Sequence, residues 1–170
     1  MNMTKNWIAA MALAALAGGA QAHQKTGHAP RQDAPVAKEQ KAWGIAGDRR
    51  AVRRTIDIAM TDDMRFTPDR IEVREGDTVR LRVKNSGKVL HELVIGTRAD
   101  LDAHAEMMAK HPGMEHDEPH MTHVQSGATG EVVWNFNRPG EFDFACLIPG
   151  HYQAGMVGTI KVTPRKEPQQ

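Results

Sequence analysis

Cysteine is almost absent from this sequence, which contains a single one, Cys146, among 170 residues. A chain with one cysteine forms no intramolecular disulfide, no Cys-x-x-Cys redox pair and no cysteine-rich zinc or iron–sulfur site of its own. The sequence also lacks an excess of charge of either sign: the net charge is +1 at pH 7, so no nucleic-acid partner is indicated. Aromatic residues are few, whereas there are ten methionines and nine histidines, and this excess needs an explanation.

The sequence also lacks an apolar run long enough to span a membrane as a helix. Its main apolar run covers residues 8–19 and precedes residues 20–22 (Ala-Gln-Ala), which have the small-x-small form of a secretory cleavage site. We therefore expect residues 1–22 to be a signal peptide that exports the protein to the periplasm. The mature chain would have no membrane anchor, and residues 23–50, poor in large apolar residues, would form a flexible N-terminal leader.

Short segments with alternating apolar residues dominate the sequence from residue 55 onward. The runs that place apolar side chains at every second position are 55–60, 71–74, 79–84, 132–136 and 142–146. Such runs, separated by Gly, Pro and Asn turns, predict short β-strands. The pattern favours an all-β sandwich or barrel over residues 51–164, with a C-terminal tail at 165–170.

One segment, residues 97–130, interrupts the strand pattern. Thr97 and Asp100 have the spacing of a helix cap, so a helix is expected over residues 98–110. Residues 114–123 show no periodicity and are expected to form a loop. The domain is therefore predicted to contain a partly helical insertion.

The single cysteine begins a motif with metal-binding character. Cys146, His151 and Met156 follow a Cys-x4-His-x4-Met spacing, and His91 supplies a second imidazole upstream. Two His, one Cys and a weakly binding Met are the ligand set of a type 1 copper site. Taken singly, Cys146 or His91 would fit an ordinary buried residue. The combined spacing favours a metal site, which would also protect the thiol in an oxidising compartment.

These residues resemble those of the cupredoxins, the family of plastocyanin, pseudoazurin, auracyanin and azurin. The resemblance runs from about residue 55 to residue 163 and is carried above all by residues 140–151 (GEFDFACLIPGH) and 154–158 (AGMVG). It implies a cupredoxin-like Greek-key β-sandwich that holds copper, as Cu(I) or Cu(II), through His91, Cys146, His151 and Met156. Many family members have Asn after the first His ligand. This sequence has Glu92 there, and we expect its carboxylate to accept a backbone N–H rather than to approach the metal.

The insertion holds five of the nine histidines and four of the ten methionines. Imidazoles and thioethers suit copper in both oxidation states, so these residues are a candidate second copper site. The alternative is that Met107 and Met108 face the core while the histidines are scattered over a polar loop. The residues concerned are His104, Met107, Met108, His111, Met114, His116, His120, Met121 and His123.

The insertion and residues 43–47 (WGIAG) together resemble a narrower group, the periplasmic cupredoxins associated with bacterial copper tolerance. This resemblance implies a protein that contributes to copper tolerance by binding and redox-handling Cu(I) and Cu(II), with a periplasmic redox or copper-transport protein as partner. The alternative is a soluble carrier of single electrons between redox partners, which would have no use for the extra His and Met residues. No enzymatic activity is expected beyond oxidation of Cu(I) at the type 1 site, because the sequence has no His-x-His motif for a trinuclear copper cluster.

Overall fold

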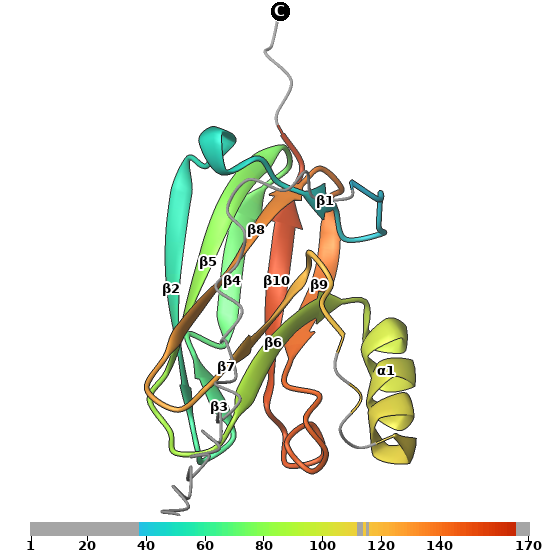
Figure 1. Cartoon of the computed structure of the whole chain (residues 1–170). Coiled ribbons are helices and arrows are strands. Elements are labelled where there is room, and N and C mark those ends of the chain that lie inside the picture. Colours follow the sequence, from blue (N-terminus) through green and yellow to red (C-terminus); the bar gives the residue numbers. More distant parts are fainter. Residues whose placement is uncertain (1–37, 112–113, 115, 166–170) are drawn as a thin grey trace, which may run out of the picture. The chain divides into compact units, whose positions relative to one another are not determined.

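The structure is a computed structural model that describes residues 38–111, 114 and 116–165 (Figure 1). The expected signal peptide at residues 1–22 and most of the expected tail lie outside these residues. Among the described residues, no helix has both the length and the apolar character needed to cross a lipid bilayer.

The described part of the chain is built mainly of strands. In chain order the elements are β1 (Ile45–Ala46), the 3-10 helix η1 (Arg49–Ala51), β2 (Arg54–Thr61), β3 (Arg65–Thr67), β4 (Arg70–Arg74), β5 (Asp77–Asn85), β6 (His91–Gly96), α1 (Arg98–Lys110), β7 (Met121–Val124), β8 (Thr129–Phe136), β9 (Gly140–Ala145) and β10 (Val157–Thr163).

The strands form two five-stranded sheets, with the orders β1-β8-β5-β2-β3 and β4-β10-β9-β6-β7. β2 runs parallel to β5 and β4 runs parallel to β10, whereas the other paired strands are antiparallel. The two sheets face each other as a β-sandwich (Figure 1). The expectation of an all-β sandwich with a partly helical insertion is confirmed.

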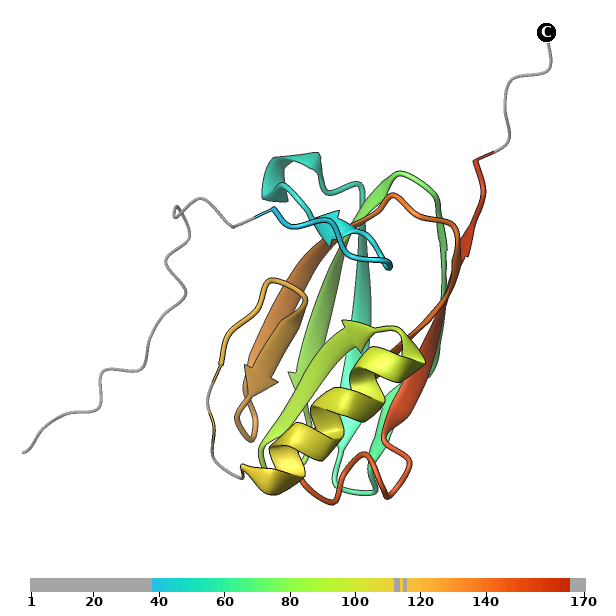
Figure 2. The same ribbon diagram turned by 90° about the vertical axis from the view of Figure 1, so that its right-hand side faces the viewer.

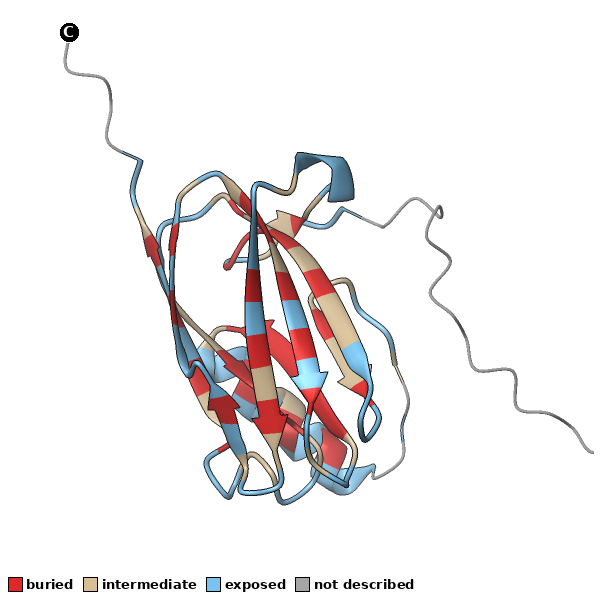
Figure 3. Cartoon of the chain, turned by 90° about the vertical axis from the view of Figure 1, so that its left-hand side faces the viewer, coloured by how far each residue is buried: buried red, intermediate tan, exposed pale blue. Residues whose placement is uncertain are grey.

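Buried and exposed side chains alternate along the strands, and this pattern explains how the two sheets pack together. Figure 3 shows buried and exposed residues alternating along the strands, because successive side chains of a strand point to opposite faces. One hydrophobic cluster joins the inner faces of both sheets, and each fully buried large side chain contributes about 1.5–3 kcal/mol. Its members in β2, β5 and β8 are Ile56, Ile58, Met60, Val79, Leu81, Val83, Val132, Trp134 and Phe136.

Residues 38–50, the described part of the expected leader, pack on the sandwich. β1 pairs with β8, and the Trp134 indole nitrogen donates a hydrogen bond of 2.9 Å to the carbonyl of Trp43, which is itself buried. Gly44 allows this approach: its φ is +127°, and a Cβ there would lie 2.3 Å from the Asn135 carbonyl oxygen.

The helix of the insertion forms where the sequence pattern predicts it. α1 covers Arg98–Lys110, and the Thr97 side chain accepts a 3.2 Å hydrogen bond from the Asp100 amide at its first turn. Leu101, Ala105 and Met108 recur at helical spacing on one face and are buried. Figure 2 shows α1 lying across the sheet beside β6, so the helix covers an outer face of the sandwich.

The expectation of a loop over residues 114–123 is wrong at its C-terminal end. Residues 121–124 form β7, which pairs antiparallel with β6 at the edge of the sheet. Met121 and Val124 are buried, whereas the two residues between them are half-buried. A strand with this burial pattern has no period-two alternation, and the sequence therefore gives no strand signal there.

Candidate metal centre

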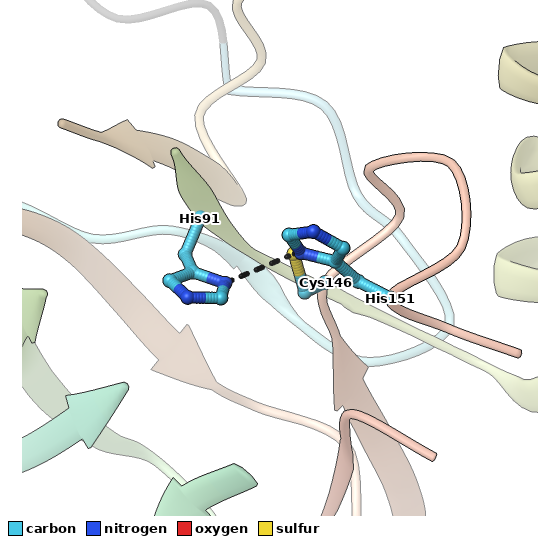
Figure 4. A group of neighbouring side chains, drawn as sticks. All are labelled: His91, Cys146 and His151. Carbon is cyan, nitrogen blue, oxygen red and sulfur yellow. Dashed lines mark hydrogen bonds between the residues drawn. The ribbon is translucent and has the colours of Figure 1, made fainter. Parts of the chain in front are cut away.

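Three side chains with metal-binding atoms converge at one end of the sandwich (Figure 4). His91 is the first residue of β6, Cys146 follows β9, and His151 lies in the loop that joins β9 to β10. The Nδ1 atoms of His91 and His151 lie 4.0 and 3.3 Å from the Cys146 sulfur. All three ligand atoms lie within 4.8 Å of one another.

The residues present fit a single metal ion. A bound transition-metal ion lies about 2.0–2.3 Å from imidazole nitrogen and from thiolate sulfur. The nitrogen and sulfur atoms that bind one ion therefore lie within about 4 Å of one another. Cys146 and His91 are fully buried and His151 is half-buried, which leaves the thiol shielded from solvent. A thiolate with two imidazoles is the trigonal donor set of a type 1 copper centre.

The expected axial residue, Met156, lies at the end of the same loop. It is fully buried in the cluster that contains Cys146, and its carbonyl accepts a 3.1 Å hydrogen bond from the Cys146 amide. The Met156 amide in turn donates to the His151 carbonyl at 3.1 Å. Gly155 completes the turn with a φ of +87°, a region that favours glycine. The loop is therefore closed by its own backbone hydrogen bonds.

The thiol and the imidazole of this loop have shifted acidities. Burial raises the pKa of the Cys146 thiol to about 12. Burial, and to a lesser degree the neighbouring His91, lowers the pKa of His151. Metal binding requires thiolate and neutral imidazole, so His151 is already in the binding form near neutral pH, whereas Cys146 must release a proton to the solvent.

Glu92 connects β6, which carries His91, to the segment after β9, which carries Cys146. The sequence predicts that its carboxylate accepts a backbone N–H. Its Oε1 accepts a 2.8 Å hydrogen bond from the Leu147 amide, and its own amide donates to the Cys146 sulfur at 3.4 Å. The carboxylate therefore bonds a backbone N–H next to the cysteine. Its second oxygen, Oε2, lies 2.8 Å from Nε2 of His123, a contact that the sequence analysis does not anticipate.

Asp62, in the turn between β2 and β3, is a further residue of the site that sequence reasoning misses. Its Oδ1 lies 3.2 Å from Nε2 of His91, and its Oδ2 accepts a 2.8 Å hydrogen bond from the Lys88 amide. A carboxylate partner on Nε2 leaves the Nδ1 lone pair of His91 facing the cysteine. No motif marks Asp62, because the contact depends on the packing of two separate turns. Gly87 allows it, since a Cβ there would lie 1.9 Å from the Asp62 carboxylate.

The methionines of the insertion do not gather at one place. Met108 and Met121 are buried, the first on the inner face of α1 and the second in the cluster beneath the helix. Met107 and Met114 are exposed, as is His111 at the end of α1. Of the pair Met107 and Met108, only the second faces the core.

The histidines of the insertion fall into two groups. His120 packs edge-on against Trp43 and Trp134, with ring centroids 5.4 and 5.9 Å away, and burial lowers its pKa. Apart from the exposed His111, the other three come from the helix, the following segment and β7, and their rings are neighbours; they are His104, His116 and His123.

Comparison with known proteins agrees with this geometry. A family model for copper-binding proteins of the plastocyanin/azurin family matches residues 52–163. The copper-resistant cuproprotein CopI of Rubrivivax gelatinosus is 49% identical over 120 residues, which cover 71% of this chain and 73% of that protein. CopI of Pseudomonas aeruginosa is 33% identical over 153 residues, covering 73% and 84% of the two chains.

A solved structure shares the fold as well. Auracyanin A, a blue copper protein from the green thermophilic photosynthetic bacterium Chloroflexus aurantiacus, superposes with a TM-score of 0.55 at 25% identity. The match covers 64% of this chain and 98% of that one. With its two-sheet sandwich, its buried His/Cys/His cluster and the family match over residues 52–163, this chain belongs to the plastocyanin/azurin family of copper-binding proteins.

Proposed function

We propose that this chain is a periplasmic type 1 copper protein that contributes to copper tolerance by binding Cu(I) and Cu(II). Its ligands are His91, Cys146, His151 and, axially, Met156. The observation that carries the proposal is the convergence of two imidazole Nδ1 atoms on one buried sulfur, a donor set suited to copper in both oxidation states. Two relatives of similar sequence are named copper-resistant cuproproteins, which supports a role in tolerance.

Copper held by this donor set supplies one-electron redox chemistry. The chain itself fixes the donors: the loop from Cys146 to Met156 is closed by backbone hydrogen bonds, and Asp62 holds the ring of His91. Donors held in this way need little rearrangement between Cu(I) and Cu(II). If bound Cu(I) were oxidised here, a periplasmic redox protein would be the external acceptor of the electron.

The location is inferred from the sequence and from the relatives. Residues 1–22 have the pattern of a secretory signal peptide. A copper-tolerance protein acts most directly where copper enters the cell envelope, and a single unpaired thiol in that oxidising compartment needs protection. Ligation of Cys146 by copper, together with its complete burial, provides it.

The surroundings of His151 favour copper handling over a dedicated electron carrier. Tyr152, next to this ligand, donates a 2.5 Å hydrogen bond to Asp102 of α1, and its hydroxyl accepts one of 3.4 Å from Arg98. Charged side chains of the insertion therefore border the ligand loop. An electron carrier needs an unobstructed apolar contact surface at this ligand, and the insertion restricts it.

Growth on graded copper tests the proposed function. The gene is deleted from its host strain and restored as wild type or as Cys146→Ser, with equal protein levels checked by immunoblotting. We expect the deletion to lower the copper concentration that stops growth, the wild type to restore it and Cys146→Ser not to. A deletion strain with normal copper tolerance but slowed respiratory electron transfer would instead establish the electron carrier.

A further inference from the structure

Asp62 contacts the ring of His91 from the turn between β2 and β3, and its carboxylate is held by the loop that leads into β6. Its Oδ2 accepts a 2.8 Å hydrogen bond from the Lys88 amide, and its Oδ1 accepts one of 3.4 Å from the Val89 amide. The same Oδ1 lies 3.2 Å from Nε2 of His91. Two backbone donors therefore hold the carboxylate against the ring nitrogen that does not face Cys146.

The loop that supplies these donors is fixed by a fully buried side chain, that of Asn85. Its Nδ2 donates hydrogen bonds of 2.8 Å to the carbonyls of Val89 and Val124. Its Oδ1 accepts one of 2.9 Å from the Gly87 amide. None of these contacts involves an expected copper ligand. The position of the carboxylate is therefore set by the packing of the two loops around it.

The two histidine ligands differ in what their rings contact. The His91 ring is fully buried and has the Asp62 carboxylate beside Nε2, whereas His151 is half-buried. Among the described residues, no acidic side chain forms a hydrogen bond or an ion pair with the His151 ring. A carboxylate therefore acts on the metal position through one of the two imidazoles, that of His91.

A carboxylate in this position has two effects on a metal-binding imidazole. It accepts the ring N–H, which fixes the tautomer, and it makes the ring a stronger donor to the metal. Its negative charge also interacts more favourably with a doubly charged ion than with a singly charged one, and the low dielectric of a buried site enlarges that difference. Both effects stabilise Cu(II) relative to Cu(I).

We propose that Asp62 is a positioning residue of the copper site, which keeps the proton of His91 on Nε2 and makes the site favour Cu(II) over Cu(I). The inference rests on the proposed type 1 site and adds the residue that sets its preference between the two ions. The Asp62 side chain is 39% exposed, so water screens part of its charge. We therefore expect an effect of about tenfold on the ratio of the Cu(II) to the Cu(I) affinity, the low end of what such partners contribute.

The test is the reduction potential of the copper-loaded protein, measured by redox titration of its visible band. Asp62→Asn removes the charge and keeps the size of the side chain. Asp63→Asn is the matched control, because it removes the same charge from the next residue, whose carboxylate contacts Thr61 and not His91. We expect Asp62→Asn to raise the potential by about 59 mV, the equivalent of a tenfold change for one electron, and the control to raise it by much less.

A purely structural role of Asp62 predicts a different result. Loosening of the His91 ring would weaken the binding of both ions alike and leave the potential unchanged, whereas the proposal predicts a selective loss of Cu(II) affinity. Equal potentials in the wild type and Asp62→Asn overturn the inference, and so does a control that shifts as far. A wild type without a sulfur-to-copper band would instead contradict the type 1 site on which the inference rests.

A second measurement uses the metal-free wild type, so the inference stays testable if Asp62→Asn does not fold. Proton–nitrogen correlation NMR identifies which ring nitrogen of His91 carries the proton. We expect the proton on Nε2, beside Asp62, and the lone pair on Nδ1, on the side of Cys146. A ring that is protonated on Nδ1 would overturn the inference.

Discussion

Two regions of this molecule are rich in potential copper ligands, and they are built differently. The loop from Cys146 to Met156 is short, closed by its own backbone hydrogen bonds and fixed at both ends by strands of one sheet. The insertion, residues 97–130, spreads nine His and Met residues over a helix, the segment after it and an edge strand. In the loop, spacing along the chain decides which side chains meet, whereas in the insertion the packing of separate elements decides it.

The difference shows that a high density of ligand residues does not define a site. In the insertion, Met108 and Met121 stabilise the core, Met107 and Met114 face solvent, and His120 packs against tryptophans. The rings of His104, His116 and His123 lie next to one another. In the first site every expected ligand lies at the same end of the sandwich, and Asp62 and Glu92 hold the ligands in place.

The largest stability difference is expected between the adjacent residues Met107 and Met108. Met108 is 4% exposed and Met107 is 38% exposed. Met108→Ala should lower the free energy of unfolding by about 2–5 kcal/mol, because it leaves a cavity under α1. Met107→Ala, as the control, should change it by less than about 0.5 kcal/mol. Urea unfolding of the metal-free protein measures both, and equal effects would contradict the assignment of Met108 to the core.

Glu92 contacts Leu147 in the ligand loop and His123 in the insertion, so its substitution tests the link between these two regions. Glu92→Ala leaves the buried amide of Leu147 without an acceptor, which should cost about 1–3 kcal/mol of stability. Glu92→Gln keeps an acceptor for that amide and should cost less. Chemical unfolding of the metal-free variants checks this order, and an alanine variant as stable as the wild type would show that the hydrogen bond to Leu147 is unimportant.

The smallest effect is expected at the start of the insertion helix. Thr97→Ala removes the side-chain acceptor of the Asp100 amide and should destabilise the protein by about 1 kcal/mol. Thr97→Ser keeps the hydroxyl and should be nearly neutral. Thermal unfolding compares the two, and a serine variant as unstable as the alanine variant would mean that the methyl group of Thr97, rather than its hydroxyl, matters.

Much of the fold could be predicted from local sequence pattern. The alternation of Ile56, Ile58 and Met60 predicts β2, and the capping pattern at Thr97 and Asp100 predicts α1. Both signals depend on residues close together in the chain. The approach of His151 to Cys146 is foreseeable for the same reason, since one short loop carries both.

The contacts that the sequence does not predict depend on how strands pair and on how α1 packs against the sheet. β7 lacks an alternating pattern, so its pairing with β6 is invisible in the sequence. The contact between Glu92 and His123 follows from that pairing, in which the two residues lie opposite each other. The approach of His104 requires in addition that α1 dock on the sheet with one particular face. Asp62 reaches His91 only because two turns pack together.

The most direct test of the central claim is the visible absorption spectrum of the Cu(II)-loaded protein. The convergence of His91, Cys146 and His151 predicts an intense sulfur-to-copper charge-transfer band in the wild type and its complete loss in Cys146→Ser, with the fold retained. A wild type that binds Cu(II) without this band, or a band that survives in Cys146→Ser, would show that the cysteine is not a copper ligand and would contradict the account.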